Sequence, residues 1–316
     1  IMTQAKAKPI VKWAGGKGQL LSQFSNYYPT ELRTNKINKY AEPFMGGGAV
    51  FFEVMQTYRI QSAYISDVNK DLVLTYWVVQ QKPQDLLHKL YEYQKIYENT
   101  SVEKRNDLFL LVREEFNQKR FTTQYQTLSD DWIIRAAQLI FLNKTCFNGL
   151  FRLNSKGGFN VPFGKYPKPT ILDEQNIWAA SRILQRTEIQ IANYDACFDH
   201  ITDNTFVYFD PPYRPISKTA SFNTYASGGF SEQDQIKLAH FFRKINTEKQ
   251  AKLMLSNSDP KNENPEDNFF ENIFNDFPIY RVSASRAINS NAEKRGAINE
   301  IVVTNYQPTP ANNLLF

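Results

Sequence analysis

The sequence contains the stretch Phe206-Val207-Tyr208-Phe209-Asp210-Pro211-Pro212-Tyr213. Its first four residues form a continuous apolar run, which is typical of a strand covered on both faces, as the strands of parallel sheets are. The run ends at the carboxylate of Asp210, and the two prolines that follow have a fixed φ and no backbone N–H, so the turn is rigid. The stretch therefore predicts an inner strand that presents a carboxylate and an aromatic ring at its carboxyl end.

Four further strand-like runs also lead to an acidic or amide side chain. In a parallel α/β sheet, ligands bind outside the carboxyl ends of the strands, so we expect these side chains to line one cleft. An acidic residue that caps the following helix would explain one or two of these strand ends. It is a poor explanation for all five, counting the run before Asp210. The sequence thus predicts an α/β fold. The four runs are Tyr40-Ala41 before Glu42, Ala63-Tyr64-Ile65-Ser66 before Asp67, Ile189-Gln190-Ile191-Ala192 before Asp195, and Leu253-Met254-Leu255 before Ser256-Asn257.

The residue types after Phe209 suit the binding of a planar ring that carries an amino group. Such an amino nitrogen is a poor nucleophile because its lone pair is delocalised into the ring, and two acceptors aimed at its N–H bonds would make it more tetrahedral. Asp210 offers a carboxylate oxygen and Pro211 a backbone carbonyl, while Tyr213 can stack on the ring. The four residues alone leave a second interpretation open, in which an ordinary strand end is followed by a Pro-Pro turn and Tyr213 merely packs.

A glycine-rich turn follows the strand that ends at Glu42. It reads Glu42-Pro43-Phe44-Met45-Gly46-Gly47-Gly48 and leads into an apolar helix, so its glycines allow a ligand to approach the backbone at a helix N-terminus. The dinucleotide pattern G-x-G-x-x-G does not fit, because Phe51 stands where that pattern has glycine. Asp67 ends the next strand, where an acid commonly binds ribose hydroxyls. Together these features favour a nucleoside ligand over a dinucleotide.

The segment Lys12-Trp13-Ala14-Gly15-Gly16-Lys17-Gly18 is not a P-loop. Lys17 is followed by glycine instead of Ser or Thr, and the first glycine of the P-loop spacing is missing. We instead assign Trp13 a stacking or wall role and Lys17 a carboxylate partner. Taken by themselves, the two residues favour the alternative in which Trp13 lies in the core and Lys17 in solvent.

These motifs, in this order, resemble those of the Dam-type DNA adenine-N6 methyltransferases, and more narrowly the GATC-modifying enzymes of the alpha group in restriction-modification systems. The resemblance implies a Rossmann-like S-adenosylmethionine-dependent methyltransferase sheet with an inserted helical DNA-recognition domain. It implies methyl transfer from S-adenosyl-L-methionine to N6 of an adenine that is flipped out of duplex DNA, with GATC as the expected site. It rests on Trp13-Ala14-Gly15-Gly16-Lys17, the turn from Glu42 to Gly48, Asp67, Phe147-Asn148-Gly149-Leu150-Phe151-Arg152, Phe159-Asn160-Val161-Pro162-Phe163-Gly164 and Asp210-Pro211-Pro212-Tyr213.

The resemblance also assigns roles to matching positions. Within the cofactor site, Asp67 would bind the ribose and Asp195 the adenine amino group. Lys165 departs from the arginine common at its point in the family, and a single ammonium cannot make the planar two-point contact of a guanidinium. The catalytic positions are Asp210, Pro211, Pro212 and Tyr213. The cofactor-binding positions are Trp13, Ala14, Gly15, Lys17, Glu42, Pro43, Phe44, Gly46, Gly48, Asp67, Asp195 and Asp210. The DNA-binding positions are Lys12, Phe147, Asn148, Leu150, Arg152, Asn160, Lys165, Ser217 and Thr219.

The pattern along the chain predicts a domain inserted into the catalytic one. Strand and turn signals up to residue 69 give way to long helical stretches, and strand signals return at Ile189. We therefore expect a catalytic domain from 1–69 and 173–316, and a helical DNA target-recognition domain at 70–172. The latter carries a hairpin-like loop at 146–166, rich in Gly, Asn and Pro. The expected helices are Leu72 to Gln81, Pro83 to Glu98, Lys104 to Lys119 and Asp131 to Phe141.

Charge is unevenly distributed along the chain, whose net charge is +5. No acidic residue lies between Asp131 and Asp173, and such a one-sign stretch is typical of a polyanion-binding surface, although a solvated basic face is the ordinary alternative. The polyanion expected here is double-stranded DNA. The basic residues of the stretch are Arg135, Lys144, Arg152, Lys156, Lys165 and Lys168.

Composition narrows the class of protein. No apolar run approaches the roughly 18 residues of a membrane span and no secretory signal is evident, so we expect a cytoplasmic protein without membrane contact. Two cysteines and three histidines have no disulfide or metal-ligand spacing, so no metal is expected. A monomer is expected, with a cognate restriction endonuclease acting on the same site as a possible partner.

Two other functions compete with DNA adenine methylation. One is a DNA-binding regulator that has lost catalysis, against which the intact stretch from Asp210 to Tyr213 and the cofactor glycines argue. The other is a methyltransferase that acts on another amino group, such as that of RNA adenine or cytosine N4. Asp210 in place of serine favours adenine, and the loop at 146–166 favours duplex DNA.

Overall fold

The computed structural model describes residues 5–214, 229–285 and 297–309. Its described strands form one sheet in the order β3-β2-β1-β4-β5-β7-β6. Strand β1 (Lys39–Glu42) pairs in parallel with β2 (Ser62–Asp67) and β4 (Thr205–Phe209), and β4 pairs in parallel with β5 (Lys252–Ser258). Strand β7 (Ala297–Thr304) is antiparallel to β5 and to β6 (Ile279–Ser285), and β3 (Thr187–Ile191) forms the other edge. The predicted α/β, Rossmann-like fold is thus confirmed.

Strand β4 is the inner strand that its sequence predicts. All five of its residues are buried, and Val207 pairs with Ala41 of β1 on one side and with Leu253 of β5 on the other. An unbroken apolar run is required there because neither face of the strand meets water. The strand ends immediately before Asp210, so the sheet delivers this carboxylate at its carboxyl edge.

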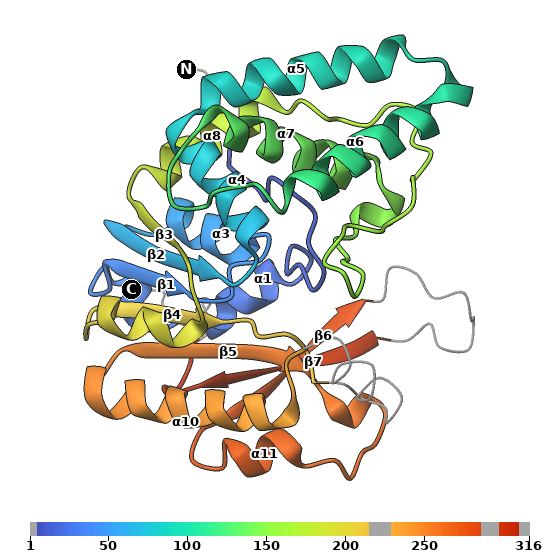
Figure 1. Ribbon diagram of the computed structural model, residues 1–316. Helices are drawn as coiled ribbons and strands as arrows, with labels where there is room; N and C mark the ends of the chain where they lie inside the picture. The colour runs from blue at the N-terminus through green and yellow to red at the C-terminus, as the bar shows by residue number, and fades with distance from the viewer. Residues whose placement is uncertain (1–4, 215–228, 286–296, 310–316) are drawn as a thin grey trace. The chain divides into compact units, whose positions relative to one another are not determined.

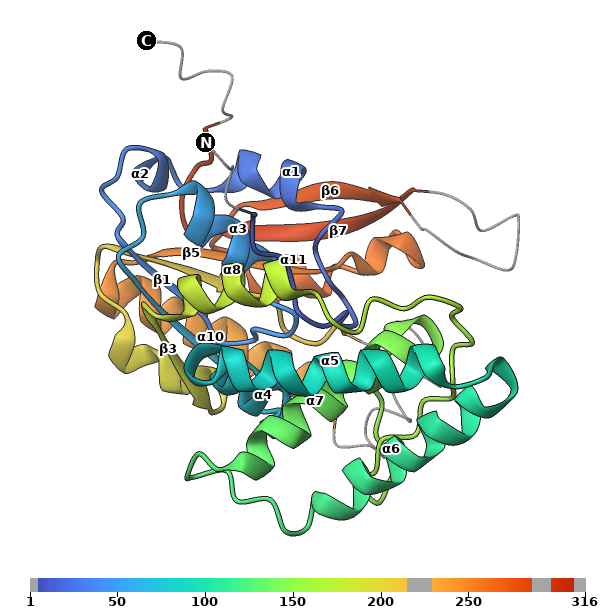
Figure 2. The same cartoon turned by 90° about the horizontal axis from the view of Figure 1, so that it is seen from above.

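The chain divides into two compact units, of which the first comprises Ile1–Gly16, Met45–Gln56 and Ser66–Ala192. Helix α7 packs against α4, α5 and α6 in this unit (Figure 2). Asn69 caps α4 by accepting a hydrogen bond from the Leu72 N–H at 3.0 Å, and Pro83 opens α5 at a position where proline costs no hydrogen bond. The helices are α3 (Ala49–Thr57, whose last residue falls in the other unit), α4 (Lys70–Gln81), α5 (Pro83–Asn99), α6 (Arg105–Lys119), α7 (Asp130–Thr145) and α8 (Glu174–Leu184), with short 3-10 turns at Val102–Lys104 and Phe147–Gly149.

The second unit comprises Lys17–Phe44, Thr57–Ile65 and Asn193–Phe316. Its core lies between helix α10 (Glu232–Lys249) and the sheet (Figure 1), where Leu238 and Phe242 join the buried residues of β4, β5 and β7. Ser231 and Asp234 form a reciprocal capping box at the start of α10. The other elements are α1 (Leu21–Phe24), α2 (Thr30–Arg33), α11 (Phe269–Ile273) and 3-10 turns at Ser25–Tyr27, Tyr194–His200 and Pro260–Asn262.

The four helices predicted between residues 72 and 141 are all present, each within a few residues of its expected bounds. Helix α8 was not predicted, although Asp173 caps it by accepting from the Asn176 N–H. The boundaries of the two compact units differ from those of the predicted domains. The first unit contains 70–172, but it also contains the glycines of the turn and strand β3, which were predicted to belong to the catalytic domain. A recognition domain at 70–172 therefore stays a prediction.

Candidate active site at the strand ends

Lys17, Asp210, Tyr213 and Glu300 form a hydrogen-bonded group, here called the strand-end cluster. The Lys17 Nζ lies 2.8 Å from Asp210 Oδ1 and donates a hydrogen bond of 2.8 Å to the Tyr213 hydroxyl. The Tyr213 hydroxyl in turn donates to Glu300 Oε1 at 2.5 Å, and Lys17 Nζ lies 4.7 Å from the centre of the Tyr213 ring. Lys17, predicted to have a carboxylate partner, therefore has one in Asp210, and it is only 2% exposed.

The charges of the cluster are strongly coupled because they are shielded from water. Burial raises the pKa of Asp210, while the Lys17 ammonium and the hydrogen bond from Ser256 oppose that shift. Burial would lower the pKa of Lys17, but Asp210, Tyr213 and Glu300 together raise it well above its usual range. Lys17 therefore stays a cation, and it keeps a negative charge on Asp210 favourable.

The carbonyls of the two prolines have different environments. Gln235 of α10 donates its side-chain N–H to the Pro212 carbonyl at 2.9 Å, and Asn257 of β5 donates to the Gln235 side-chain oxygen at 3.3 Å. Within the described part of the chain, no hydrogen bond reaches the carbonyl of Pro211. The turn is thus anchored through Pro212, which leaves the Pro211 carbonyl as an acceptor beside Asp210.

Glu300 was not singled out from the sequence. It lies on β7 among apolar residues, and it is 7% exposed. A carboxylate directly before an apolar run of a strand, here Ile301-Val302-Val303, is costly to bury without a cationic partner, and this is the signal that could have found it. The sequence around Glu300 does not indicate its contact with Tyr213, because the two residues are 87 positions apart.

The glycine turn and Asp67 contact one another in the first unit. Asp67 Oδ2 accepts the Gly46 N–H at 3.1 Å, and Oδ1 accepts the Asn69 N–H at 2.9 Å. Gly46 and Gly48 have φ values of +46° and +71°, which a residue with a Cβ rarely adopts. Burial raises the pKa of Asp67 against these backbone donors. The backbone N–H groups of Gly46 and Asn69 therefore fix the position of the Asp67 carboxylate beside the turn.

Trp13 forms a wall of this turn. Its ring stacks on Phe151, with centroids 4.9 Å apart, and a Cβ on Gly46 would meet the indole at 3.0 Å. The wall role predicted for Trp13 thus agrees with its packing. Ala14 and Gly15 follow it as exposed residues, and Gly15 has a φ of +74°.

The remaining cofactor positions lie in the second unit. Glu42 is buried and accepts a hydrogen bond of 2.6 Å from the Tyr40 hydroxyl, and Pro43 is buried beside it. Phe44 stacks on Tyr194 at 5.3 Å, so an aromatic pair adjoins the exposed carboxylate of Asp195. These residues offer a flat apolar surface next to an acceptor.

The loop at 146–166 has the antiparallel form predicted for it, with bridges between Cys146 and Phe163 and between Leu153 and Phe159. Its path is fixed mainly through backbone atoms. Asn117 of α6 bonds both the N–H and the carbonyl of Phe159, and the Tyr97 hydroxyl donates to the Tyr166 carbonyl at 2.6 Å. Four of the predicted DNA-binding side chains are exposed on this loop, together with Phe147, which is 51% exposed; the four are Asn148, Leu150, Arg152 and Lys165.

The described DNA-binding candidates differ in how far they are engaged. Arg152 Nε donates to the Asn160 side-chain oxygen at 2.7 Å, so these two candidates contact each other. The backbone of Lys12 is fixed by two hydrogen bonds of 2.8 Å with the Asn143 side chain, which also donates to the Gly149 carbonyl. Lys12 is thereby brought to the loop. Ser217 and Thr219 lie outside the described residues.

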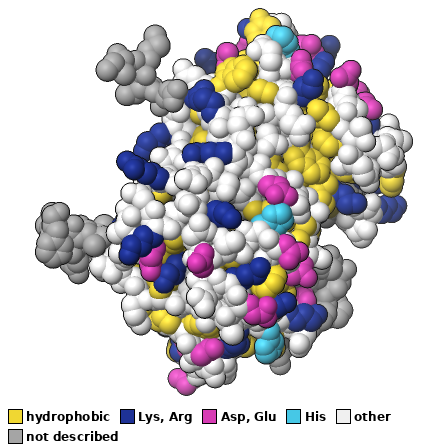
Figure 3. Space-filling model, turned by 90° about the vertical axis from the view of Figure 1, so that its left-hand side faces the viewer, with side chains coloured by type: hydrophobic (Ala, Val, Ile, Leu, Met, Phe, Trp, Pro, Cys, Tyr) yellow, Lys and Arg dark blue, Asp and Glu magenta, His cyan; other side chains and the backbone are white. Residues whose placement is uncertain are grey.

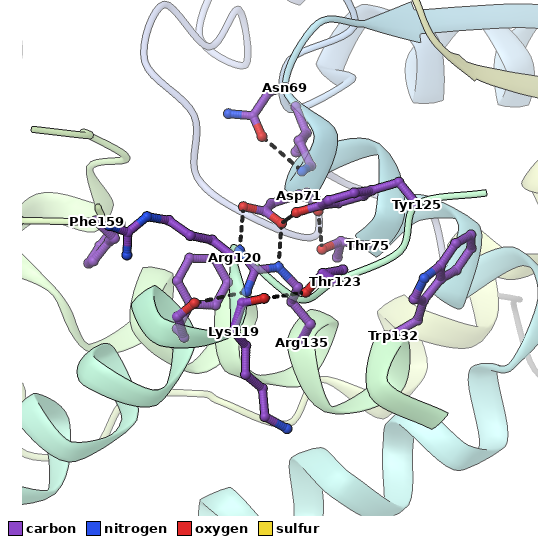
Figure 4. A network of polar contacts seen from close by, with 12 residues as sticks. Asn69, Asp71, Thr75, Lys119, Arg120, Thr123, Tyr125, Trp132, Arg135 and Phe159 are labelled. Atoms are coloured by element: carbon purple, nitrogen blue, oxygen red, sulfur yellow. Dashed lines mark hydrogen bonds and ion pairs between the residues drawn. The ribbon is translucent and has the colours of Figure 1, made fainter. Parts of the chain in front are cut away.

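Arg135 corrects the prediction that all basic residues of its stretch face a polyanion. It is 1% exposed and forms a two-point ion pair with Asp71, with distances of 2.5 and 2.9 Å, while Tyr125 donates to the same carboxylate at 2.7 Å (Figure 4). Its guanidinium also donates to the Phe116 carbonyl. Arg135 therefore joins α7 to α4 and α6 in the first unit. Figure 3 shows one face on which basic side chains alternate with acidic ones.

The described residues include neither a metal-binding cluster nor a helix able to span a membrane. No cluster of His, Cys, Asp or Glu there has the arrangement of a metal site. No helix in this part of the chain combines the length and the apolar character needed to span a membrane.

A mostly parallel sheet with carboxylates at its strand ends defines the Rossmann-like methyltransferase class. The chain matches the D12 class N6 adenine-specific DNA methyltransferase family over residues 13–288, and it belongs to that family. It is therefore an adenine-specific DNA methyltransferase, and its substrate is DNA. Because this family methylates DNA adenine, three alternatives are set aside: a DNA-binding regulator without catalysis, methylation of RNA adenine and methylation of cytosine N4.

Known relatives match along nearly the whole chain. Type II methyltransferase M.MjaIII of Methanocaldococcus jannaschii is 42% identical over 302 residues, which cover 95% of this chain and 100% of that protein. Type II methyltransferase M1.LlaDCHI of Lactococcus lactis subsp. cremoris is 35% identical, with 95% of each chain covered. A DNA adenine methylase of Vibrio cholerae is 31% identical, covering 94% of this chain and 95% of that protein.

Proposed function

We propose that the protein transfers a methyl group from S-adenosyl-L-methionine to N6 of the adenine in GATC, within duplex DNA. The observation that carries the proposal is the pair of acceptors after β4. Asp210 is paired with the Lys17 ammonium, which favours its carboxylate form against the effect of burial, and the neighbouring Pro211 carbonyl has no hydrogen-bond donor among the described residues. Two acceptors side by side match the two N–H bonds of an exocyclic amino group.

Each residue of the turn has a separate task in this mechanism. Asp210 and Pro211 accept the two N–H bonds of the adenine and so direct the nitrogen lone pair toward the methyl donor. Pro212, anchored by Gln235, keeps the turn rigid, and Tyr213 stacks on the base. Removing the adenine from the duplex costs a few kcal/mol, which these contacts partly offset. Alignment of the reacting atoms supplies most of the acceleration, so no covalent enzyme intermediate is needed.

The residues present fit S-adenosyl-L-methionine as the donor. The Asp67 carboxylate accepts hydrogen bonds from the backbone of its own turn and has two oxygens, which suits it to accept hydrogen bonds from the two ribose hydroxyls. Phe44 and Tyr194 offer an aromatic surface and Asp195 an acceptor for the adenine amino group. When bound, this cofactor supplies an electrophilic methyl group on sulfur. The positions proposed to hold it are the twelve named from the resemblance.

Sequence readout is proposed for the loop at 146–166 together with Lys12. Asn148 and Arg152 carry donors suited to purine edges in the major groove, where a good two-point contact discriminates by about 1 to 3 kcal/mol. Leu150 would pack on a thymine methyl group. We further propose that the recognition domain spans 70–172, that the protein is monomeric and cytoplasmic, and that an endonuclease cleaving the same unmodified site accompanies it.

Transfer of label tests the proposal. The protein is incubated with S-adenosyl-L-methionine tritiated on the methyl group and with duplexes that contain GATC or a scrambled site. Label is expected in GATC adenine alone. A second measurement digests methylated plasmid with nucleases that distinguish modified from unmodified GATC. Label at another adenine-containing site would refute the GATC assignment, and absence of label on every duplex would refute the proposed donor.

A further inference from the structure

Glu300 has a carboxylate that the mechanism above does not use. It lies on β7, opposite Ser258 of β5 and Val282 of β6, and its neighbours Ile301, Val302 and Val303 are apolar and buried. A buried carboxylate without a partner would be unfavourable, and its partners here are the Tyr213 hydroxyl and, at 3.8 Å, the Lys17 ammonium. Glu300 therefore points toward the catalytic turn.

The contacts of Glu300 are unlike those of a residue that only stabilises the sheet. Its Oε1 accepts the short Tyr213 hydrogen bond, whereas its Oε2 is buried and has no hydrogen-bond partner among the described residues. Buried polar atoms in proteins are nearly always hydrogen-bonded, so an atom whose one polar contact in the described part of the chain is an ion pair at 3.8 Å calls for an explanation. Neither adjacent strand supplies a described side-chain partner. The carboxylate is thus directed at Tyr213 and Lys17.

The Tyr213 hydroxyl is fixed from two sides. Lys17 can only donate, so the hydroxyl oxygen accepts from it, and the single hydroxyl hydrogen must then point to Glu300. The ring itself is 37% exposed, so little packing holds it in place. With its Cβ set by the rigid turn and its hydroxyl oxygen set by two partners, the long axis of the ring has one direction. A phenolic O–H bond prefers the plane of its ring, so the hydrogen bond to Glu300 also favours one rotation of the ring about that axis.

We propose that Glu300 is a positioning residue, which fixes the plane of the Tyr213 ring through the hydrogen bond that it accepts from the Tyr213 hydroxyl. The inference rests on the proposed function, in which Tyr213 stacks on the target adenine. Glu300 acts through its acceptor oxygen. Glutamine retains such an oxygen and alanine does not, so the two substitutions should behave differently.

The test compares Glu300→Ala, Glu300→Gln, Tyr213→Phe and the double variant Tyr213→Phe with Glu300→Ala. The rate of a single turnover is measured on a GATC duplex at saturating S-adenosyl-L-methionine. Glu300→Ala should slow the step about 10- to 100-fold, as expected for a misplaced reacting group, and should leave the dissociation constants of both substrates nearly unchanged. Glu300→Gln should retain a rate within about threefold of the unaltered protein, and the double variant should be no slower than Tyr213→Phe.

Tyr125→Phe is a matched control, because Tyr125 also donates its hydroxyl to a carboxylate, that of Asp71, in the other unit. It should keep the unaltered rate. Fluorescence of 2-aminopurine at the target position should rise in Glu300→Ala, because a loosely held ring stacks on the base less. Three results would overturn the inference. The first is an unaltered rate in Glu300→Ala, and the second is a loss of rate in Glu300→Gln equal to that in Glu300→Ala. The third is a loss of rate in the double variant equal to the product of the losses in the two single variants. If the unaltered protein transfers no methyl group, the proposed function fails instead.

Discussion

The strand-end cluster and the loop at 146–166 are built in opposite ways. The cluster consists of side chains that bond one another, such as Lys17 with Asp210 and Tyr213 with Glu300, and two of them, Lys17 and Glu300, are buried. The loop is held through its backbone, by side chains that lie elsewhere, such as Asn117 and Tyr97, while its own Asn148 and Arg152 are exposed. A change of side chain should therefore disturb the cluster as a whole, but should alter the loop only at the position changed.

This difference suits the two tasks proposed for the regions. Chemistry requires reacting groups fixed within a fraction of an ångström, which a network of mutually dependent side chains provides. Reading bases requires side chains that are replaceable one at a time on a backbone that keeps its course. The following four predictions test whether the cluster and the loop differ in this way.

Asp210→Ala should have the largest effect. It removes one of the two acceptors and leaves the Lys17 charge without its nearest partner, so we expect kcat to fall about 1000-fold or more. The affinity for GATC duplex should change little, because the loop is untouched. Methyl-transfer assays and filter binding on the same preparation measure the two quantities. Turnover at the normal rate would remove the proposed role of Asp210.

Lys17→Met should shift the pH dependence of activity. Burial raises the pKa of Asp210 and the Lys17 ammonium opposes that rise, so removing the ammonium lets the pKa climb further. Asp210 accepts an N–H bond only when it is ionised, and activity is lost as the pH falls through its pKa. The acid limb of the kcat profile should accordingly move to higher pH. Glu300 and Tyr213 also face Lys17, and their contribution is measured by repeating the profile in Glu300→Gln.

The contrast between the regions also separates what sequence could predict from what it could not. Asp210, Asp67 and the glycine turn were identified because each follows an apolar strand, a local pattern that fixes where a side chain is delivered. Glu300 and the Arg135–Asp71 pair were missed, because their roles depend on contacts between residues that are 87 and 64 positions from their partners. Arg135 looks like a surface charge in the sequence, and only tertiary packing shows that it is buried.

Arg152→Ala should affect choice of site more than affinity. An exposed guanidinium that makes a two-point contact to a purine discriminates by about 1 to 3 kcal/mol, so methylation of sites with a changed base should rise relative to GATC by about 10- to 100-fold. Competition between duplexes in one reaction gives this ratio. Asn160→Ala is its matched variant, since Asn160 accepts from Arg152. Equal weakening on all duplexes would instead identify Arg152 as a phosphate contact.

Lys165→Arg should have the smallest effect, and it should be a gain. Lys165 is exposed with a φ of +59°, a conformation that costs arginine and lysine alike, so the substitution should leave stability unchanged. A guanidinium can make two parallel hydrogen bonds where an ammonium makes a single point contact, and the added bond should sharpen discrimination at one base pair by about 1 kcal/mol. Rates on GATC should stay the same, because the strand-end cluster does not include the loop. A change in kcat of the same size as the change in discrimination would show that the loop and the strand-end cluster are not independent, and would contradict the difference inferred between them.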